Sequence, residues 1–249
     1  GIEARADGGS VTLSAADGSM DMQQISIFGK PVWSEQTLTV NGREIPAKQN
    51  GWQLLHTNAS LPMTLSSSMP WQIGFINIER PGRGVTVSAM GINGAQLSQW
   101  SKWRPGMWED LAQTKADLII LAYGTNEAFS GNLDISSTER TWRNYIRQIK
   151  NTLPNAGILI LGAPESLKTA YGSCGNRPVL LSEVQQMQQR VARDEKIMFW
   201  SWQDAMGGAC SMKSWMAQGL AAKDGVHFSA QGYETAADKL ADSLIRFAQ

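Results

Sequence analysis

The sequence lacks the main features of several common protein classes. Its 22 basic and 22 acidic residues cancel, so it has no broad positive field to attract nucleic-acid phosphates. Its longest apolar run, residues 118–123, is far shorter than the roughly 18 residues that a membrane span needs. Two histidines and two separated cysteines do not supply the clustered ligands of a zinc site. We therefore expect no nucleic-acid partner, no membrane span and no metal.

The two cysteines, Cys174 and Cys210, leave two alternatives open. They form a disulfide in an oxidising compartment, or they remain buried thiols, which are about as common in a protein of this size. The even count favours the disulfide only slightly. The ten tryptophans are an unusually large number for this length. They suit stacking on flat ligands such as sugars, although for most of them filling the core is the favoured interpretation.

The first 80 residues are expected to form β-structure without helices. Short β-branched and aromatic runs alternate with Gly, Pro, Asn and Ser clusters, and they lie at residues 11–13, 25–28, 38–40, 52–55 and 71–78. Asn41-Gly42 between two such runs predicts a hairpin, because this pair accepts the positive φ angles of a type I′ turn. Residues 1–80 are therefore predicted to belong to a β-sandwich.

After a turn-rich joint at residues 81–84, apolar runs alternate with amphipathic segments. Buried parallel strands are predicted at residues 85–90, 118–123, 158–162 and 197–202, and helices at residues 97–112, 138–153 and 180–194. A last helix follows Ser229, a suitable N-cap, and the residues that share one of its faces are Tyr233, Ala237, Leu240, Leu244 and Phe247. This alternation predicts an open α/β sheet with right-handed crossovers over residues 81–249.

Three polar or glycine-rich turns follow these strands or precede the last helix. In open parallel sheets, ligands bind beyond the carboxyl ends of the strands. Gly94 ends a turn after the first predicted strand, and Asn126 follows the second. Asp224 and His227 precede the last helix, where the carboxylate can orient the imidazole of a general base. Each signal alone fits an ordinary turn, but their conjunction predicts a catalytic site.

This conjunction resembles the SGNH subgroup of the GDSL esterases and lipases. Gly94, Asn126, Asp224 and His227 match the second, third and last blocks of that family, and the resemblance covers about residues 84–249. Residues 91–98, the Trp-rich segment after them and residues 123–129 look more narrowly like bacterial peptidoglycan O-acetylesterases. The resemblance implies a flavodoxin-like three-layer α/β hydrolase domain. It also implies that residues 1–80 are all or part of a carbohydrate-binding-module-like β-sandwich, inserted between the first two blocks.

The first block of the family, an apolar strand that runs into Gly-Asp-Ser, does not occur in the sequence. Asp17-Gly18-Ser19 has the wrong order, and no other serine follows both an apolar strand and a glycine turn. In a flavodoxin-like strand order the missing first strand would be central. We therefore expect an N-terminal segment outside this sequence to supply the central strand and the nucleophile. An unrecognised segment within residues 1–80 is the less favoured alternative.

The expected function is that of a serine esterase that removes O-acetyl groups from peptidoglycan or a related cell-wall glycan, in the periplasm or cell envelope and without a cofactor. The resemblance assigns the base to His227, its orientation to Asp224, and the oxyanion donors to the Gly94 N–H and the Asn126 amide. We expect these groups to line one shared space. Two alternatives remain: a non-catalytic carbohydrate-binding protein, and an esterase for another acetylated polysaccharide or a lipid.

Trp100 and Glu127 are the candidate substrate-binding residues. Trp100 follows the glycine block and is able to stack on a sugar ring, although its helical spacing from Trp103 favours a core position. Glu127 follows Asn126 directly, and a solvent-exposed carboxylate is the favoured interpretation. His56, in the β-rich region, is expected to be a surface or structural histidine.

Overall fold

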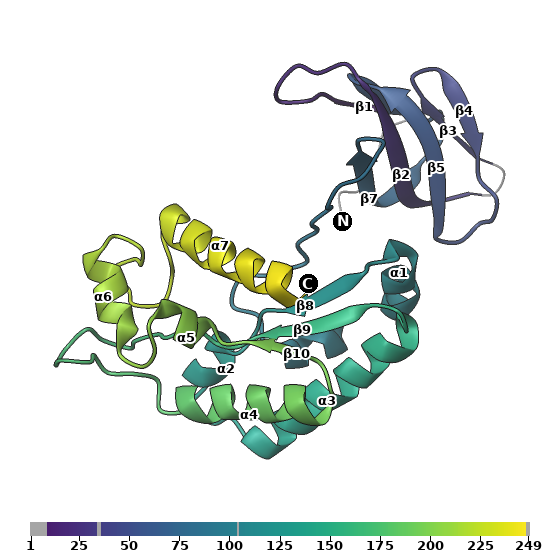
Figure 1. Ribbon diagram of the computed structural model, residues 1–249. Helices are drawn as coiled ribbons and strands as arrows, with labels where there is room; N and C mark the ends of the chain where they lie inside the picture. Colours follow the sequence, from purple (N-terminus) through teal and green to yellow (C-terminus); the bar gives the residue numbers. More distant parts are fainter. Residues whose placement is uncertain (1–8, 34–35, 104, 248–249) are drawn as a thin grey trace. The chain divides into compact units, whose positions relative to one another are not determined.

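The computed structural model of the chain describes residues 9–33, 36–103 and 105–247. The chain divides into two compact units, Gly1–Met90 and Gly91–Gln249. The first unit is rich in strands, and the second alternates strands with helices (Figure 1). None of the helices in the described ranges has the length and hydrophobicity needed to cross a membrane.

The first unit consists of two antiparallel sheets. Its strands are β1 (Ser10–Leu13), β2 (Met22–Pro31), β3 (Thr37–Val40), β4 (Arg43–Pro46), β5 (Gln53–Ser60), β6 (Met63–Ser66) and β7 (Trp71–Glu79). One sheet has the order β1-β6-β3-β4 and the other β5-β2-β7. The turn between β3 and β4 has φ angles of 46° at Asn41 and 80° at Gly42, so the predicted hairpin is confirmed.

Alternation along much of the strands gives the first unit its core. Ile25, Ile27 and Leu55 point inward and join one hydrophobic cluster with residues of both sheets, among them Leu38, Val40, Met63 and Leu65. The residues between them on the sequence, such as Gln24 and His56, are exposed. This is the pattern of antiparallel sheets with one face on a core and the other in water.

The second unit is built on a parallel sheet of the order β10-β9-β8, with β8 (Leu118–Leu121), β9 (Gly157–Leu161) and β10 (Met198–Trp200). The three later predicted strands are thus confirmed. The 3-10 helix η1 (Leu97–Lys102) and the α-helices α1 (Met107–Thr114), α2 (Thr125–Phe129), α3 (Ile135–Thr152), α4 (Leu181–Asp194), α5 (Trp202–Met206), α6 (Ser211–Ala217) and α7 (Ala230–Phe247) surround it.

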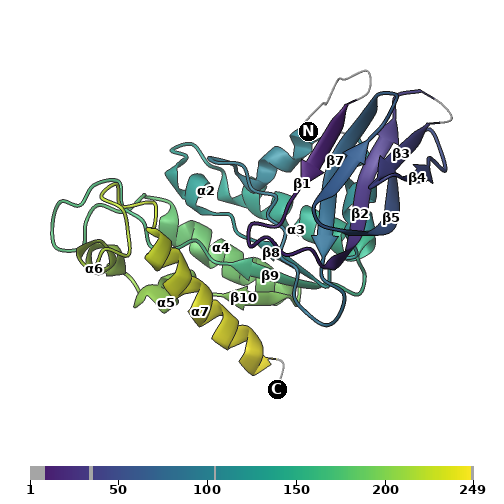
Figure 2. The ribbon, with the colours of Figure 1, turned by 90° about the horizontal axis from the view of Figure 1, so that it is seen from above.

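Helices lie on both faces of this sheet. Helices α3 and α4 cover one face, and α7 lies over the other (Figures 1 and 2). Trp142, Ile146 and Ile149 of α3 are fully buried against Ile158 and Ile160 of β9 in the larger core. A second cluster lies around α5, α6 and the start of α7, and it contains Met206, Met212, Trp215 and Phe228. The predicted α/β layering is therefore present.

The predicted strand at residues 85–90 is wrong. These residues form no strand, and Val85 and Val87 are 92% and 87% exposed. In a flavodoxin-like order the second strand pairs only with the first, which lies between it and the third. No first strand of this kind occurs among the described residues, so the apolar run has no partner for its backbone groups.

The predicted single helix at residues 97–112 is divided into η1 and α1. Pro105 has no N–H to continue a helical ladder, and Gly106 adopts a φ of 92° immediately before α1. The chain therefore starts a new helix at Met107. The predicted helices at residues 138–153 and 180–194 are confirmed as α3 and α4, with boundaries within a few residues.

The last helix is confirmed, and its cap is the predicted one. The N–H of Gly232 donates to Ser229 Oγ at 3.1 Å. Its packing face differs from the prediction, because Tyr233 is 48% exposed while Ala236 is buried. A side chain at Gly232 would collide with the carbonyl of Leu220, so the bare glycine allows that side of α7 to approach. The side chain of Phe247 lies outside the described residues.

Candidate active site

Two of the predicted turns lie side by side at the end of the sheet. Gly94 adopts a φ of 76°, which turns the chain after residues 91–93. Asn126 Nδ2 donates to the carbonyl oxygen of Ala95 at 2.9 Å, and Gln96 Nε2 donates to the carbonyl oxygen of Asn126 at 3.2 Å. An amide Nδ2 carries two hydrogens, so one remains for a ligand. The glycine turn and the asparagine turn are therefore one local structure.

Glu127 fixes the two turns to each other. Its Oε1 accepts the N–H of Leu97 at 2.9 Å, and its Oε2 accepts the N–H of Gly124 at 2.9 Å. The side chain is only 1% exposed, so the expectation of a solvated carboxylate is wrong. Burial raises the pKa of Glu127, while the two backbone N–H groups act in the opposite direction. Because both oxygens face backbone donors, the carboxylate orients the turns, and its predicted contact with substrate stays a prediction.

Asp224 and His227 form a hydrogen-bonded pair on the turn before α7. The distance from Asp224 Oδ2 to His227 Nδ1 is 2.7 Å. Asp224 Oδ1 also accepts the N–H groups of Val226 and His227, at 2.8 and 3.0 Å. These bonds, led by the one from the His227 N–H, lower the pKa of Asp224 to about 2. The carboxylate is therefore ionised at neutral pH and holds an imidazole that is 73% exposed.

The loop after β9 lies between these two parts of the site. At its start, the N–H of Ala163 donates to Gln188 Oε1 at 2.8 Å, and Gln188 Nε2 donates to the carbonyl oxygen of Tyr123 at 2.7 Å. Further along, the N–H of Leu167 donates to the carbonyl oxygen of Gly225 at 2.8 Å. One loop thus contacts the asparagine turn near its start and the histidine turn further along. That His227 reaches the space beside Gly94 and Asn126 stays a prediction.

Gly124 shows how tightly these loops pack. Its φ is 122°, and a Cβ atom there would lie 2.7 Å from Gln188 Nε2 and 2.9 Å from the Cβ of Ala163. A side chain would therefore push apart the two loops that follow β8 and β9. The glycine is required by both its backbone angle and its close neighbours.

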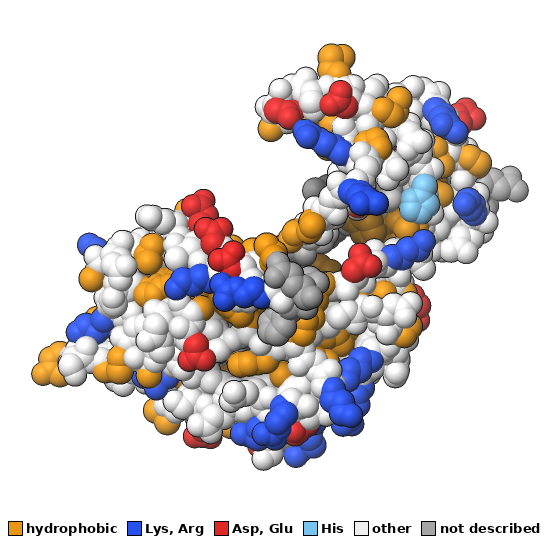
Figure 3. Space-filling view, in the orientation of Figure 1, with side chains coloured by type: hydrophobic (Ala, Val, Ile, Leu, Met, Phe, Trp, Pro, Cys, Tyr) orange, Lys and Arg blue, Asp and Glu red, His pale blue; other side chains and the backbone are white. Residues whose placement is uncertain are grey.

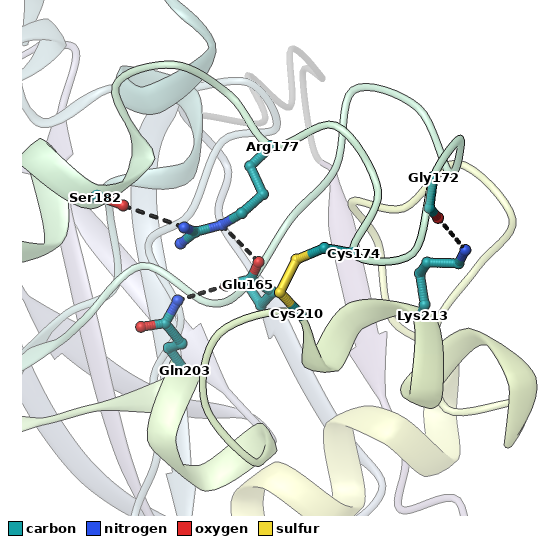
Figure 4. The surroundings of a disulfide bond; sticks show 8 residues. All are labelled: Glu165, Gly172, Cys174, Arg177, Ser182, Gln203, Cys210 and Lys213. Carbon is teal, nitrogen blue, oxygen red and sulfur yellow. Dashed lines mark hydrogen bonds and ion pairs between the residues drawn. A yellow bond between two sulfur atoms is a disulfide. The ribbon is translucent and has the colours of Figure 1, made fainter.

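The loop after β9 is fastened by ionic and covalent contacts (Figure 4). Glu165 is fully buried, with its Oε1 2.7 Å from Arg177 Nε and its Oε2 2.5 Å from Gln203 Nε2. Cys174 forms a disulfide with Cys210, at the start of α6. The slightly favoured alternative for the two cysteines is thus the one that the structure has. These contacts hold the backbone that carries Leu167.

Trp100 belongs to an aromatic cluster. Its ring stacks on Trp103 with centroids 4.8 Å apart, and its Nε1 donates to the hydroxyl of Tyr123 at 2.9 Å. It is half-buried and packs against the larger core. The structure gives Trp100 a packing role beside the strand that leads to Asn126, and a contact with a sugar ring stays a prediction.

Comparison with known proteins agrees with these blocks. A model of the GDSL-like Lipase/Acylhydrolase family matches residues 72–235. The chain belongs to the GDSL-like lipase/acylhydrolase family. The match spans the Gly94, Asn126 and Asp224–His227 turns, so the resemblance in the sequence is confirmed at the level of the family.

Solved structures extend this GDSL assignment. A peptidoglycan O-acetylesterase is 64% identical with a TM-score of 0.91, and the alignment covers 96% of this chain and 68% of that one. A Bacillus subtilis protein has 11% identity and a TM-score of 0.50, over 96% of this chain and 80% of that one, and it shows similarity of fold alone. No curated protein matches the chain.

Two buried polar residues of this GDSL site were missed from the sequence. Gln188 is fully buried and bridges the loops after β8 and β9. A signal was present, because Gln188 interrupts the apolar stripe that Val184, Met187 and Val191 form on α4. Glu165 gave no signal, because its partners Arg177 and Gln203 are distant in the sequence.

The surface charges agree with the neutral composition. On the face shown in Figure 3, basic and acidic side chains are interspersed, and one group of basic side chains lies along the lower edge over α3 and α4. On α3, Arg143 pairs with Glu139 of the same helix, and Arg147 pairs with Glu195 at the end of α4. Within the described ranges, no group of three or more His, Cys, Asp or Glu side chains is arranged to hold a metal ion.

Proposed function

We propose that this protein is a serine esterase that removes O-acetyl groups from peptidoglycan. The observation that carries the proposal is the 64% identity, over 96% of the chain, to a peptidoglycan O-acetylesterase. The paired Asp224 and His227 would supply the base and its orienting carboxylate, and the joined Gly94 and Asn126 turns would supply the oxyanion donors. The substrate is an acetyl ester on a sugar hydroxyl, and the products are acetate and the free hydroxyl.

The proposed reaction is acyl transfer in two steps. His227 Nε2 takes the proton from a serine hydroxyl as the serine oxygen attacks the acetyl carbonyl carbon. The tetrahedral intermediate collapses, the sugar oxygen leaves with the proton from His227, and the acetyl group stays on the serine. Water, deprotonated by His227, then attacks the acyl carbon, and acetate is released as the serine oxygen leaves and takes the proton from His227. Asp224 stays ionised throughout and stabilises the imidazolium that forms twice.

The negative charge on the carbonyl oxygen is stabilised by hydrogen-bond donors that are already in place. No hydrogen bond from the Gly94 N–H occurs within the described part of the chain, and Asn126 Nδ2 keeps one hydrogen after its bond to Ala95. Donors fixed before the reaction need no reorganisation as charge develops, and each contributes on the order of 3 kcal/mol. Glu127 holds both in position.

We further propose that the nucleophile lies on a strand supplied from outside this sequence. Three features support it. β8 is an edge strand of the described sheet, although its residues are apolar and Ile120 is 42% exposed. Residues 85–90 form no strand, although Val85, Val87 and Met90 are apolar and exposed. The matched O-acetylesterase is longer than this chain, which covers 68% of it. A strand that lies beside β8 and ends in Gly-Asp-Ser would form hydrogen bonds with the unpaired backbone groups of β8.

Residues 10–79 are proposed to serve the enzyme as a carbohydrate-binding β-sandwich in the cell envelope. Two antiparallel sheets share one core in this unit, which is a suitable scaffold for a glycan-binding surface. The disulfide between Cys174 and Cys210 is typical of an oxidising compartment such as the periplasm. The acetylated glycan of peptidoglycan lies in that compartment in bacteria with an outer membrane.

Acetate release from O-acetylated peptidoglycan tests the proposal. The chain is assayed alone and after N-terminal extension with the proposed Gly-Asp-Ser strand, and only the extended form is expected to be active. In the extended form, His227→Ala should abolish acetate release, and Asp224→Asn should reduce kcat by about 10³- to 10⁴-fold, because the imidazole loses its orienting charge. Tyr171→Phe, on the exposed tip of the loop after β9, is a matched control.

Three results would contradict parts of this proposal. Equal activity of the chain without the extension would place the nucleophile within the printed sequence. Near wild-type activity of His227→Ala would refute the role of the imidazole. A panel of acetylated xylan, acetylated peptidoglycan and long-chain esters separates the substrates, and preference for a long acyl chain would exclude a deacetylase.

A further inference from the structure

The turn that carries Asp224 and His227 is held at its base by its own backbone. The N–H of Ala222 donates to the carbonyl oxygen of His227 at 2.8 Å, and Ala221 forms an isolated antiparallel bridge with Phe228. Phe228, directly after His227, is buried in the hydrophobic cluster around α5 and α6. These contacts fix the base of the turn. The position of its exposed tip, which contains Asp224, depends on other contacts.

Leu167 is the residue that contacts this tip. Its N–H donates to the carbonyl oxygen of Gly225 at 2.8 Å, and among the described residues this is the one backbone hydrogen bond that reaches the tip from outside the turn. Gly225 adopts a φ of 72°, and a Cβ atom there would lie 3.0 Å from Leu167 Cβ and 3.3 Å from its carbonyl oxygen. The backbone next to Asp224 therefore packs directly against Leu167.

The far end of the Leu167 side chain packs against a second glycine. Gly175 adopts a φ of 79°, and a Cβ atom there would lie 2.6 Å from Leu167 Cδ1 and 2.8 Å from Cδ2. Gly175 directly follows Cys174, which the disulfide joins to Cys210 at the start of α6. Leu167 is only 1% exposed. One buried side chain thus contacts both a covalently anchored segment and the turn of the candidate base.

Hydrogen bonds fix the backbone on the anchored side of Leu167. The N–H of Lys168 donates to the carbonyl oxygen of Asn176 at 2.6 Å, and the N–H of Asn176 donates to the carbonyl oxygen of Thr169 at 2.8 Å. Thr169 and Asn176 form an antiparallel bridge, which brings Gly175 back beside Leu167. Because this side is closed by hydrogen bonds and by the disulfide, a loss of volume at Leu167 acts mainly on the exposed histidine turn.

We propose that Leu167 is a positioning residue for the Asp224–His227 pair. Its side chain and its N–H determine where Gly225 lies, and Gly225 is part of the backbone that joins Asp224 to His227. Asp224 Oδ1 accepts the N–H groups of Val226 and His227, so displacement of the tip weakens both bonds and reorients the imidazole. The inference rests on the proposed function only for the catalytic use of His227.

Amide hydrogen exchange of the complete chain, measured by NMR, tests this role without requiring esterase activity. Leu167→Ala should speed exchange of the Val226 and His227 amides by about tenfold or more, because the turn opens locally more often. The Leu97 and Gly124 amides, in the other part of the candidate site, should exchange as in the parent.

Three further variants complete the test. Met212→Ala is the matched control, because Met212 is equally buried in the same hydrophobic cluster. It should leave the exchange of Val226 and His227 close to that of the parent. Leu167→Met, which conserves volume, should restore the slow exchange. Leu167→Val is a milder truncation that keeps the measurement possible if Leu167→Ala does not fold, and it should speed the same two amides.

Three outcomes would overturn the proposal. The first is unchanged exchange of Val226 and His227 in the folded Leu167 truncations. The second is an equal acceleration in Met212→Ala, and the third is an equal acceleration of all amides, since both would mean that Leu167 only fills the core.

Kinetics of the extended form separate this proposal from the esterase assignment. Leu167→Ala should lower kcat for a small acetyl ester by about tenfold with little change in KM, because the base is misplaced while substrate binding is retained. A parent that is inactive in the extended form would refute the esterase assignment, and the exchange rates would still decide the role of Leu167. A raised KM with an unchanged kcat would contradict the positioning of the base.

Discussion

At the scale of single residues, Glu127 is a buried carboxylate that connects the glycine turn to the asparagine turn of the candidate site. Its two oxygens accept N–H groups from segments about thirty residues apart in the sequence. A buried carboxylate is expensive unless donors surround it, and here the donors belong to the backbone that carries Gly94 and Asn126. The carboxylate therefore adds two hydrogen bonds to those that Asn126 and Gln96 already form between the turns.

Glu127→Gln is expected to separate these turns. One side of the amide is an NH2 group, which repels a backbone N–H, so one buried hydrogen bond is lost at about 1–3 kcal/mol. The expected result is a lower kcat for the extended enzyme with a smaller effect on KM. Steady-state kinetics and denaturant unfolding measure both. Glu109→Gln, on the surface of α1, is the control, and a kcat equal to the parent's would contradict the positioning role.

The stability of the parent relative to Glu127→Gln should also depend on pH. Burial raises the pKa of Glu127 in the folded protein above its unfolded value. At a pH between the two pKa values, the folded state binds more protons than the unfolded state. The contribution of Glu127 to the free energy of unfolding is therefore fully present below the unfolded-state pKa, and it is lost as the pH rises through the folded-state pKa. Unfolding free energies at several pH values from 4 to 8 measure the difference, and a rise with pH would contradict the assignment.

At the scale of elements, the loop between β9 and α4 contacts both parts of the candidate site. It begins at Ala163 beside Gly124 and contacts the histidine turn through Leu167. It then extends outward and is tied to α5 and α6 by Glu165 and by the disulfide. A long loop with these fixed points acts as part of the scaffold rather than as a lid.

Removal of the disulfide should destabilise this loop. The bond closes a sequence separation of 36 residues, and the loss of that constraint on the unfolded chain corresponds to about 3–4 kcal/mol. The double variant Cys174→Ser, Cys210→Ser should therefore melt at a lower temperature than the oxidised parent. Reductant should lower the melting temperature of the parent and leave the double variant unchanged. Equal melting temperatures of parent and variant would show that the other contacts suffice.

At the scale of the whole molecule, the two units bury separate cores. Ile27 belongs to the cluster of the first unit, while Ile146 and Val184 belong to that of the second. Among the residues that the structure describes, none belongs to both clusters. Each unit therefore has the means to fold on its own hydrophobic contacts.

Core truncations should act on one unit at a time. Ile27→Ala removes a fully buried side chain, and a cost of about 2–5 kcal/mol is expected in the first unit alone. Calorimetry should show a lowered transition for that unit and an unchanged one for the other, and Ile146→Ala should give the reverse. A single transition that shifts equally in both variants would mean that the units unfold together.

The sequence alone determined what local patterns encode. β-branched and aromatic runs predicted the strands of the first unit, and Asn41-Gly42 predicted its hairpin. Helical periodicity predicted α3, α4 and α7. The Gly94 and Asn126 turns were predicted from their positions after apolar runs, and the Asp224–His227 turn from its position before the last helix. These features are local because backbone angles, side-chain period and caps act within a few residues.

Tertiary structure decided the rest, because burial and pairing depend on neighbours far along the chain. The apolar residues 85–90 form no strand, since a strand needs a partner and none is present within the described residues. Glu127 is buried rather than solvated because two distant backbone segments converge on it. Gln188 links the loops after β8 and β9 because of the way α4 packs beside them. The side of α7 that contains Gly232, rather than the side of Tyr233, is buried because the backbone of Leu220 lies against it.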